Sequence, residues 1–126
     1  MISREQIEQN LAIIKLTIEN FNGLDTYAII EYLGEITALQ ALATETQAAA
    51  KFHLLCAMDE ELDRQAKLSK NESVAPSIKK MRADSKCRDW HYLYELCQRY
   101  SSNISHTIDA CRTKISYYKQ ELQNQH

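Results

Sequence analysis

The sequence contains little of the two residues that most often interrupt regular structure, with only two glycines and one proline in 126 residues. Loop-rich folds need both residues at their turns, so this scarcity, together with many Ala, Leu, Glu, Gln and Lys residues, predicts an all-α chain. The length fits a single domain. Hydrophobic residues make up 44% of the chain, which is enough for an elongated core.

Long apolar runs and targeting segments are also missing. The longest nearly apolar run, from Phe52 to Met58, is far too short to span a bilayer. The start, from Met1 to Glu5, lacks the apolar core of a signal peptide. Four cysteines without extracellular signals indicate free thiols in a reducing compartment. We therefore expect a cytoplasmic protein that makes no membrane contact.

Catalytic motifs are absent as well. The sequence has no Gly-rich phosphate loop, no nucleophile elbow and no His-Glu-x-x-His. His106 precedes Cys111 by five residues, a spacing that places the two side chains on different faces of a helix. Burial of Cys111 would raise the pKa of its thiol and make it inert. These observations predict a protein that is not an enzyme.

The most regular feature of the sequence is an apolar stripe near its C-terminal end. Its members follow one another by three and then four residues without a slip, and ten of the eleven are apolar or aromatic: Cys87, Trp90, Tyr94, Cys97, Ser101, Ile104, Ile108, Cys111, Ile115, Tyr118 and Leu122. A spacing that averages 3.5 residues keeps one face of a helix turned toward one partner, as in coiled coils.

Start and stop signals divide the chain into three predicted helices, at residues 4–20, 26–69 and 74–123. Ser3 and Gln6 form a capping box for the first helix, and Gly23 supplies its stop. Asp25 is the expected N-cap of the second helix. The break at residues 70–73 predicts a turn, after which Pro76 is tolerated only in a first helical turn. The third helix is expected to bend near residues 84–85, where the apolar stripe changes phase.

Two helices of about 45 residues joined by a short turn must lie antiparallel. The shorter first helix would then pack on the open end of this hairpin. Charge supports the pairing, because residues 1–73 hold six Lys/Arg and twelve Asp/Glu, a net −6, whereas residues 74–126 hold nine and five, a net +4. The predicted fold is an elongated antiparallel helical hairpin with a third helix packed on it, a coiled-coil-like three-helix bundle.

Two pairs of metal-ligating residues would face each other if the hairpin turned symmetrically about residue 72. His53 would lie opposite His91, and Cys56 near Cys87. Paired ligands at one-turn spacing on facing helices suit a tetrahedral zinc site and a zinc-stabilised structural module. The alternative is that both cysteines are small core residues and that the histidines lie on the flanks of the helices.

A basic and aromatic segment opens the third predicted helix. It contains five cations followed by Trp90, Tyr92 and Tyr94; the cations are Lys79, Lys80, Arg82, Lys86 and Arg88. Clustered cations beside stacking rings can bind single-stranded nucleic acid. In the assumed register, however, Asp59, Glu60, Glu61 and Asp63 lie opposite the cations, and ion pairs between the helices would neutralise the segment.

Several tyrosines lie off the main stripe: Tyr32, Tyr92, Tyr100 and Tyr117. Some of them must cover the first helix. Any that remain exposed would form an aromatic surface for a protein partner or for a second copy of the chain. The alternative is that the third packed helix covers all of them. Apolar surface left over on the hairpin would favour a homo-dimer.

The layout of residues 40–122 resembles one known kind of protein. An Ala-rich helix, a break with Ser-Val-Ala before a Lys-rich start, the segment Asp109-Ala110-Cys111-Arg112-Thr113-Lys114-Ile115-Ser116 and a short Lys-Gln-Glu end are similar to small helical-hairpin proteins of phage early regions, often encoded beside single-strand annealing recombinases. The chain departs from them in its stripe cysteines and its extra first helix. The resemblance implies a phage or mobile-element setting and carries over no site residues.

Taken with the missing catalytic motifs, these features predict a non-enzymatic protein that binds another macromolecule. A protein partner is the first expectation, with a role as an accessory to recombination or as an inhibitor of a host defence system. The alternatives are a nucleic-acid-binding accessory and a zinc-stabilised structural module.

Overall fold

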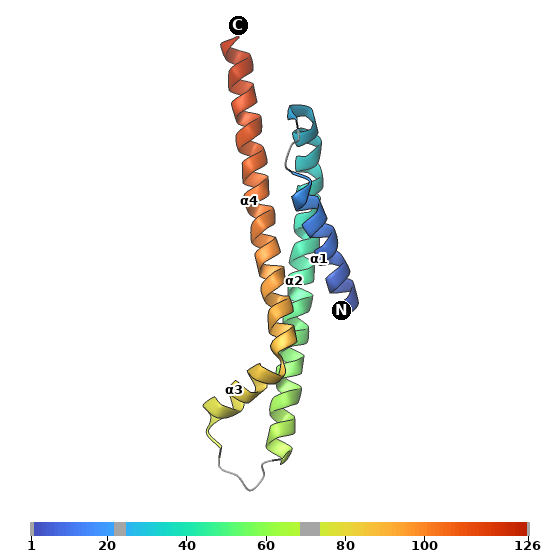
Figure 1. The fold of residues 1–126 in the computed structure, drawn as a ribbon, viewed down its shortest axis with the longest axis vertical. Coiled ribbons are helices and arrows are strands. Elements are labelled where there is room, and N and C mark those ends of the chain that lie inside the picture. The colour runs from blue at the N-terminus through green and yellow to red at the C-terminus, as the bar shows by residue number, and fades with distance from the viewer. Residues whose placement is uncertain (1, 22–24, 69–73, 126) are drawn as a thin grey trace.

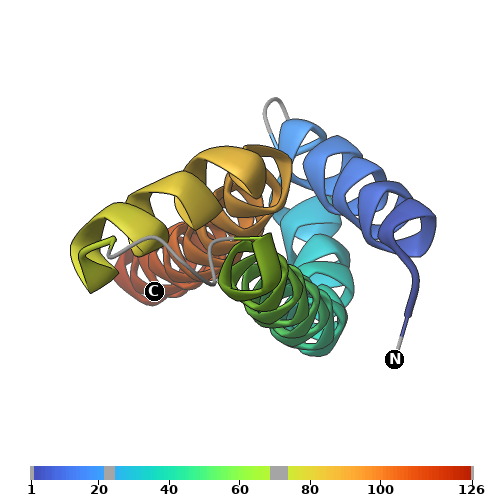
Figure 2. The same ribbon diagram turned by 90° about the horizontal axis from the view of Figure 1, so that it is seen from below.

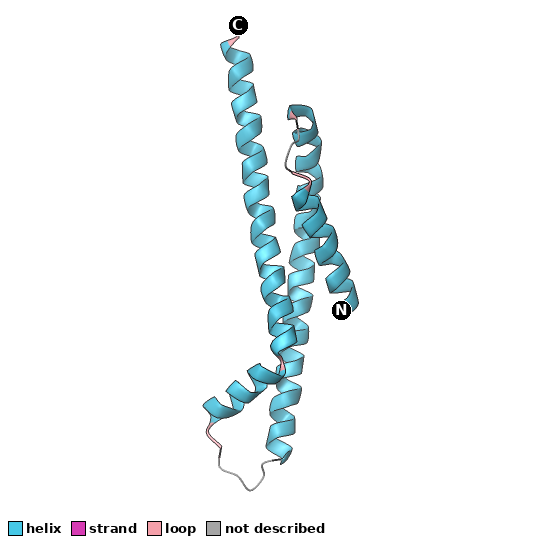
Figure 3. Cartoon of the chain, viewed as in Figure 1, coloured by secondary structure: helices cyan, strands magenta, loops and turns pink. Residues whose placement is uncertain are grey.

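The computed structural model describes residues 2–21, 25–68 and 74–125. These ranges contain four helices and no strand: α1 (Arg4–Glu19), α2 (Thr26–Leu68), α3 (Pro76–Lys86) and α4 (Arg88–Asn124). Helices account for almost the whole drawn chain (Figure 3). The prediction of an all-α protein is confirmed.

The helix starts follow the capping residues in the sequence. The Ser3 Oγ accepts a hydrogen bond from the backbone N–H of Gln6 at 3.2 Å, and the Asp25 Oδ1 accepts one from Ala28 at 2.8 Å. The Gln6 side chain does not reach back as a capping box requires; its amide instead donates to the Asn10 Oδ1 at 2.8 Å. Pro76 opens α3, as predicted. The expected stop at Gly23 and turn at residues 70–73 lie outside the described residues.

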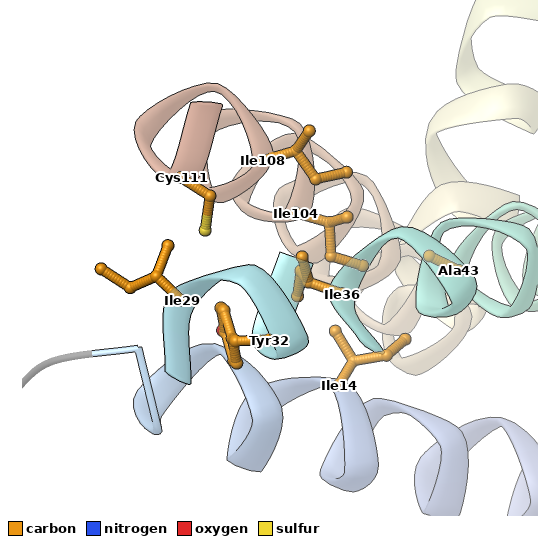
Figure 4. Close-up of a cluster of buried hydrophobic side chains, with 8 residues drawn as sticks. All are labelled: Ile14, Ile29, Tyr32, Ile36, Ala43, Ile104, Ile108 and Cys111. Atoms are coloured by element: carbon orange, nitrogen blue, oxygen red, sulfur yellow. The ribbon is translucent and has the colours of Figure 1, made fainter. Parts of the chain in front are cut away.

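The longest helices, α2 and α4, lie side by side and run in opposite directions (Figure 1). Between them lies a cluster of buried side chains to which α4 contributes Ile104, Ile108 and Cys111 (Figure 4). The α2 members of this cluster are Ile29, Tyr32, Ile36 and Ala43, and α1 adds Ile14. The middle of the predicted stripe is therefore the buried face of α4.

A second cluster joins α1 to the middle of the pair. Ile7 and Leu11 of α1 pack with Ala49 and Ala50 of α2 and with Leu93 of α4, among others. Small alanine side chains let a neighbouring helix approach closely, and larger side chains from α1 and α4 fill the space beside them. The Ala-rich middle of α2 thus serves as a common packing surface for two helices.

The third predicted helix is in fact two helices, because the chain breaks at Cys87. Its backbone (φ −99°, ψ 21°) departs from α-helical geometry, although helical hydrogen bonds continue on both sides, from Cys87 to Ala83 and from His91 to Cys87. The ring of His91 bonds across the break to the Asp84 carboxylate at 3.1 Å. As a result α3 projects away from the line of α4 (Figure 1). The bend expected at residues 84–85 lies slightly later in the chain.

The first helix does not cover the end of the α2–α4 pair where α2 begins. The Tyr32 hydroxyl donates to the Thr17 carbonyl oxygen at 2.5 Å, which places the end of α1 beside Tyr32, beyond the first turn of α2. The last turns of α4 also extend past the start of α2 (Figure 1). The first turn of α2 and the last turns of α4 are therefore left without a covering helix.

Candidate functional site

An apolar groove occupies this uncovered end, between the first turns of α2 and the last turns of α4. Its volume is about 390 Å³, and seven residues line it: Thr26, Tyr27, Ile30, Ile115, Tyr118, Lys119 and Leu122. Tyr27 is 84% exposed and Leu122 is 59% exposed. Large apolar side chains this exposed and this close together are characteristic of contact surfaces in soluble proteins. We call these seven residues the open-end groove.

Aromatic rings extend this surface around α4. Tyr117 lies next to Tyr118 in an edge-on contact, with 6.4 Å between ring centroids and 68° between ring planes. Tyr117 also lines a second hollow on the neighbouring face, together with Lys114 and Glu121. Tyrosine suits a contact surface because it combines a large apolar ring with a polar tip and few rotatable bonds.

The four tyrosines predicted to bind a partner fall into three different environments. Tyr117 and Tyr92 are both exposed, but Tyr92 lies beside α1, far along α4 from Tyr117. Tyr100 is half-buried and packs against both core clusters. Tyr32 is a core residue and is one of the tyrosines that cover the first helix. Its ring lies against Phe21, its hydroxyl donates a hydrogen bond to Thr17 of α1, and burial raises the pKa of that hydroxyl to about 12.

The residues expected to form a zinc site do not come together. The His53 ring stacks on Trp90, with 4.9 Å between centroids, and its Nε2 lies 2.7 Å from the Ile2 carbonyl oxygen. His91 turns toward Asp84 instead. Burial and the nearby carboxylates of Glu61 and Asp84 raise the pKa of the Cys87 thiol, which disfavours the thiolate that binds metal. Within the described ranges no three His, Cys, Asp or Glu side chains are grouped to hold a metal ion.

The cysteines differ in their burial, and this gives a direct prediction. Cys87, Cys97 and Cys111 are buried, whereas Cys56 is half-buried. Burial raises the pKa of all three buried thiols, that of Cys97 to about 11. Because the thiolate is the reactive form, we expect a thiol-specific dye at pH 8 to modify Cys56 quickly and the other three only on unfolding. Cys56→Ser should remove the fast phase, and two or more fast thiols would contradict the buried positions.

The basic segment is divided by the break at Cys87. Lys79, Lys80, Arg82 and Lys86 lie on α3, whereas Arg88 begins α4. The expected ion pairs with α2 are not found in the described part of the chain. Two of the four acids instead pair within α2, Glu61 with Arg64 at 2.6 Å and Asp63 with Lys67 at 3.0 Å. The outward direction of α3 is the physical reason. The pKa of the Glu61 carboxyl is lowered mainly by its hydrogen bond from Arg64, and Lys86 of α3 makes a smaller contribution.

Two of the three rings that were expected to stack on nucleic-acid bases contact other side chains instead. Trp90 contacts both the His53 ring, which stacks on it, and the Arg4 guanidinium, whose carbon lies 5.1 Å from the ring centroid. The Lys51 ammonium lies 5.8 Å from the centroid of Tyr94. Tyr92 alone of the three is exposed. The exposed ring, Tyr92, thus lies one helical turn from Arg88 on α4, whereas the other four cations lie across the break on α3.

The sequence did not predict the open-end groove. Its periodicity assigned Tyr118 and Leu122 to the buried stripe, and nothing in it singled out Tyr27 as a binding residue. The 3.5-residue spacing continues to Leu122, but it says nothing about where the partner helix ends. The lengths of the two helices could have indicated the groove. Because α2 begins at Thr26, the last turns of the third predicted helix extend past most of α2 in the predicted register and have few α2 residues to pack against. Exposed Tyr27 and Ile30, one turn apart, mark the same place.

None of the helices in the described ranges combines the length and hydropathy needed to cross a membrane. No protein-family model matches the chain, and no curated protein or solved structure matches it at a significant level.

Proposed function

We propose that this chain is a non-enzymatic accessory protein that works by binding another protein at the open-end groove. The observation that carries the proposal is the groove itself, where Tyr27, Ile30, Tyr118 and Leu122 are exposed side by side at the end of an otherwise packed helix pair. In this proposal the α2–α4 pair is a coiled-coil-like antiparallel scaffold, and the groove is its contact surface.

The shape and chemistry of the groove favour a helical segment of the partner. Two helices that diverge from their shared core leave a channel in which a third helix can lay its apolar face, with anchors at one-turn spacing. Lys119 lies at the edge of the groove, so an acidic flank on the partner helix would be attracted to it. The expected ligand is therefore an amphipathic helix with an acidic edge.

The biological setting rests on the resemblance of residues 40–122 to small helical-hairpin proteins of phage early regions. It supports a protein of a phage or other mobile element that acts inside the host cell. An accessory to recombination and an inhibitor of a host defence system both fit a small protein that works only by occupying a surface of its partner.

Site-specific crosslinking in the host cell tests this function. With a photoreactive phenylalanine analogue in place of Leu122, irradiation should join the chain to one other protein, which mass spectrometry then identifies. The matched control places the same analogue at Gln120, which is exposed on the same part of α4 but lines a different face.

The proposal requires that the adduct form from Leu122 and be absent from Gln120. Equal adducts at both positions, adducts with nucleic acid, or no adduct other than two joined copies of this chain would each overturn it.

A further inference from the structure

The outer face of α2 carries a second apolar stripe that no part of the described chain covers. Its nine members follow one another by three or four residues: Tyr27, Ile30, Gly34, Ala38, Ala41, Glu45, Ala48, Phe52 and Leu55. All nine are exposed. In the end-on view α3 and α4 lie to the left of and above α2, α1 lies above it and to the right, and the lower side of α2 is open (Figure 2). A helix that is apolar on both sides is typical of a buried position in a larger assembly.

The stripe is symmetric about Ala41. Tyr27 and Leu55 each lie 14 residues from Ala41, Ile30 and Phe52 each lie 11 residues from it, and Gly34 and Ala48 each lie 7 residues from it. The small residues are thus in the middle and the large ones at both ends. When two copies of such a helix cross antiparallel, with a two-fold axis at Ala41, each large residue meets a large residue of the other copy, and the small ones let the backbones approach.

Charge follows the same symmetry. Glu31 and Lys51 each lie 10 residues from Ala41, both are exposed, and they lie beside the stripe. In the antiparallel arrangement Glu31 is level with Lys51 of the second copy, and the two-fold axis creates this opposite-charge pair twice. Glu45, the charged member of the stripe, is level with the uncharged Thr37. A parallel arrangement would instead bring like charges together, Glu31 with Glu31 and Lys51 with Lys51.

The exposed area of the stripe approaches what a stable pair needs. Four large members of the stripe are each between 48% and 84% exposed: Tyr27, Ile30, Phe52 and Leu55. A Cβ atom added at Gly34 would meet no atom of another helix within 4 Å, so this position is open as well. With the alanines, the stripe offers on the order of 600 Å² per copy, since one aromatic ring alone covers about 150–250 Å². A standard interface buries about 800 Å² per partner, and flanking polar residues would supply the remainder.

From these observations we infer that the occupant of the outer face of α2 is a second copy of the chain, joined by an antiparallel α2–α2 contact centred on Ala41. This contact extends the proposed function and does not depend on the identity of its partner. Tyr27 and Ile30 belong both to this contact and to the α2 side of the open-end groove, whereas Tyr118 and Leu122 on its α4 side stay outside the contact. The functional unit would be a dimer in which Tyr118 and Leu122 of each copy remain free to meet the protein partner.

Light scattering combined with size-exclusion chromatography, over about a hundredfold range of concentration, tests the pair. The wild-type chain should have the mass of a dimer. Ala41→Glu places two like charges on the axis and should give the mass of a monomer, whereas Gln40→Glu adds the same charge beside the stripe and should leave the dimer intact. Circular dichroism should show the same helix content in all three, because both positions are exposed. A wild-type monomer at every concentration, or a dimeric Ala41→Glu, overturns the inference.

Disulfide formation tests the direction and the register, and it remains informative if a charged variant fails to fold. In a Cys56→Ser background, Ala41→Cys should form a disulfide-linked dimer on mild oxidation, because position 41 meets itself on the axis. Gly34→Cys should form a linked dimer slowly, if at all, because its counterpart is position 48 of the second copy. Equal rates for the two, or faster linkage of Gly34→Cys, would indicate a parallel or different contact and would overturn the inference.

Discussion

Ile104→Ala is expected to lower the free energy of unfolding by about 2–5 kcal/mol. Ile104 is fully buried where α1, α2 and α4 meet, in one cluster with Ile14, Ile36 and Ile108 (Figure 4). Removing three side-chain carbons there leaves a cavity that surrounding helices can fill only in part, so the loss of contacts adds to the loss of apolar burial. Urea unfolding followed by circular dichroism measures the change.

The matched control for this change is Leu122→Ala. Leu122 belongs to the same 3.5-residue stripe of α4, but it is 59% exposed. Its replacement should change the free energy of unfolding by no more than about 0.5 kcal/mol, since few contacts are lost and alanine favours the helix. Similar losses for the two variants would mean that the last turns of α4 are covered, which would also remove the open-end groove.

This contrast shows what the sequence pattern could and could not predict. Spacing identified the face of α4 that packs, and Cys97, Ile104, Ile108 and Cys111 are buried on it. The same spacing continues to Leu122, where there is no covering helix. Periodicity describes the face of one helix, whereas burial depends on the length and position of its neighbour, and these are set by the other elements of the fold.

The failed zinc site has a related cause. The register assumed from the turn placed His53 opposite His91, and in the structure His53 stacks on Trp90, one residue away. One residue rotates a side chain by about 100° around a helix. The level of two residues along the helices therefore does not decide a site: Trp90 is the residue that faces His53, whereas the ring of His91 bonds to Asp84.

The break at Cys87 had a weaker sequence signal, because neither Gly nor Pro marks it. A shift in the phase of the apolar residues before Cys87 indicated a bend, but the direction of α3 could not be inferred from it. That direction decides whether the cations of α3 meet the acids of α2. It also explains why the net charges of the two halves, although opposite, do not appear as ion pairs along the described parts of α2 and α3.

Thr46→Val is expected to lower the free energy of unfolding by about 1–3 kcal/mol, although the two side chains have nearly the same size. The fully buried Thr46 hydroxyl accepts a hydrogen bond from the Asn10 amide at 3.1 Å and donates one to the Leu42 carbonyl oxygen at 2.7 Å. Valine cannot accept the bond, so the buried amide of Asn10 loses that partner and α1 loses one of its polar attachments to α2. Urea unfolding measures the loss.

Thr44→Val is the matched control, because it makes the same change of side chain at a position that has no hydrogen bond to α1. Thr44 lies two residues before Thr46 on α2 and is exposed. Its hydroxyl donates the same kind of hydrogen bond to a helix carbonyl oxygen, that of Gln40 at 2.9 Å. Its replacement removes no contact with α1 and should alter stability by no more than about 0.5 kcal/mol. A loss from Thr46→Val no larger than that from Thr44→Val would mean that the bond from Asn10 adds nothing to the packing of α1 through Ile7, Leu11 and Ile14. A larger loss would show that this bond helps to hold α1 on α2, in the position that leaves the open-end groove uncovered.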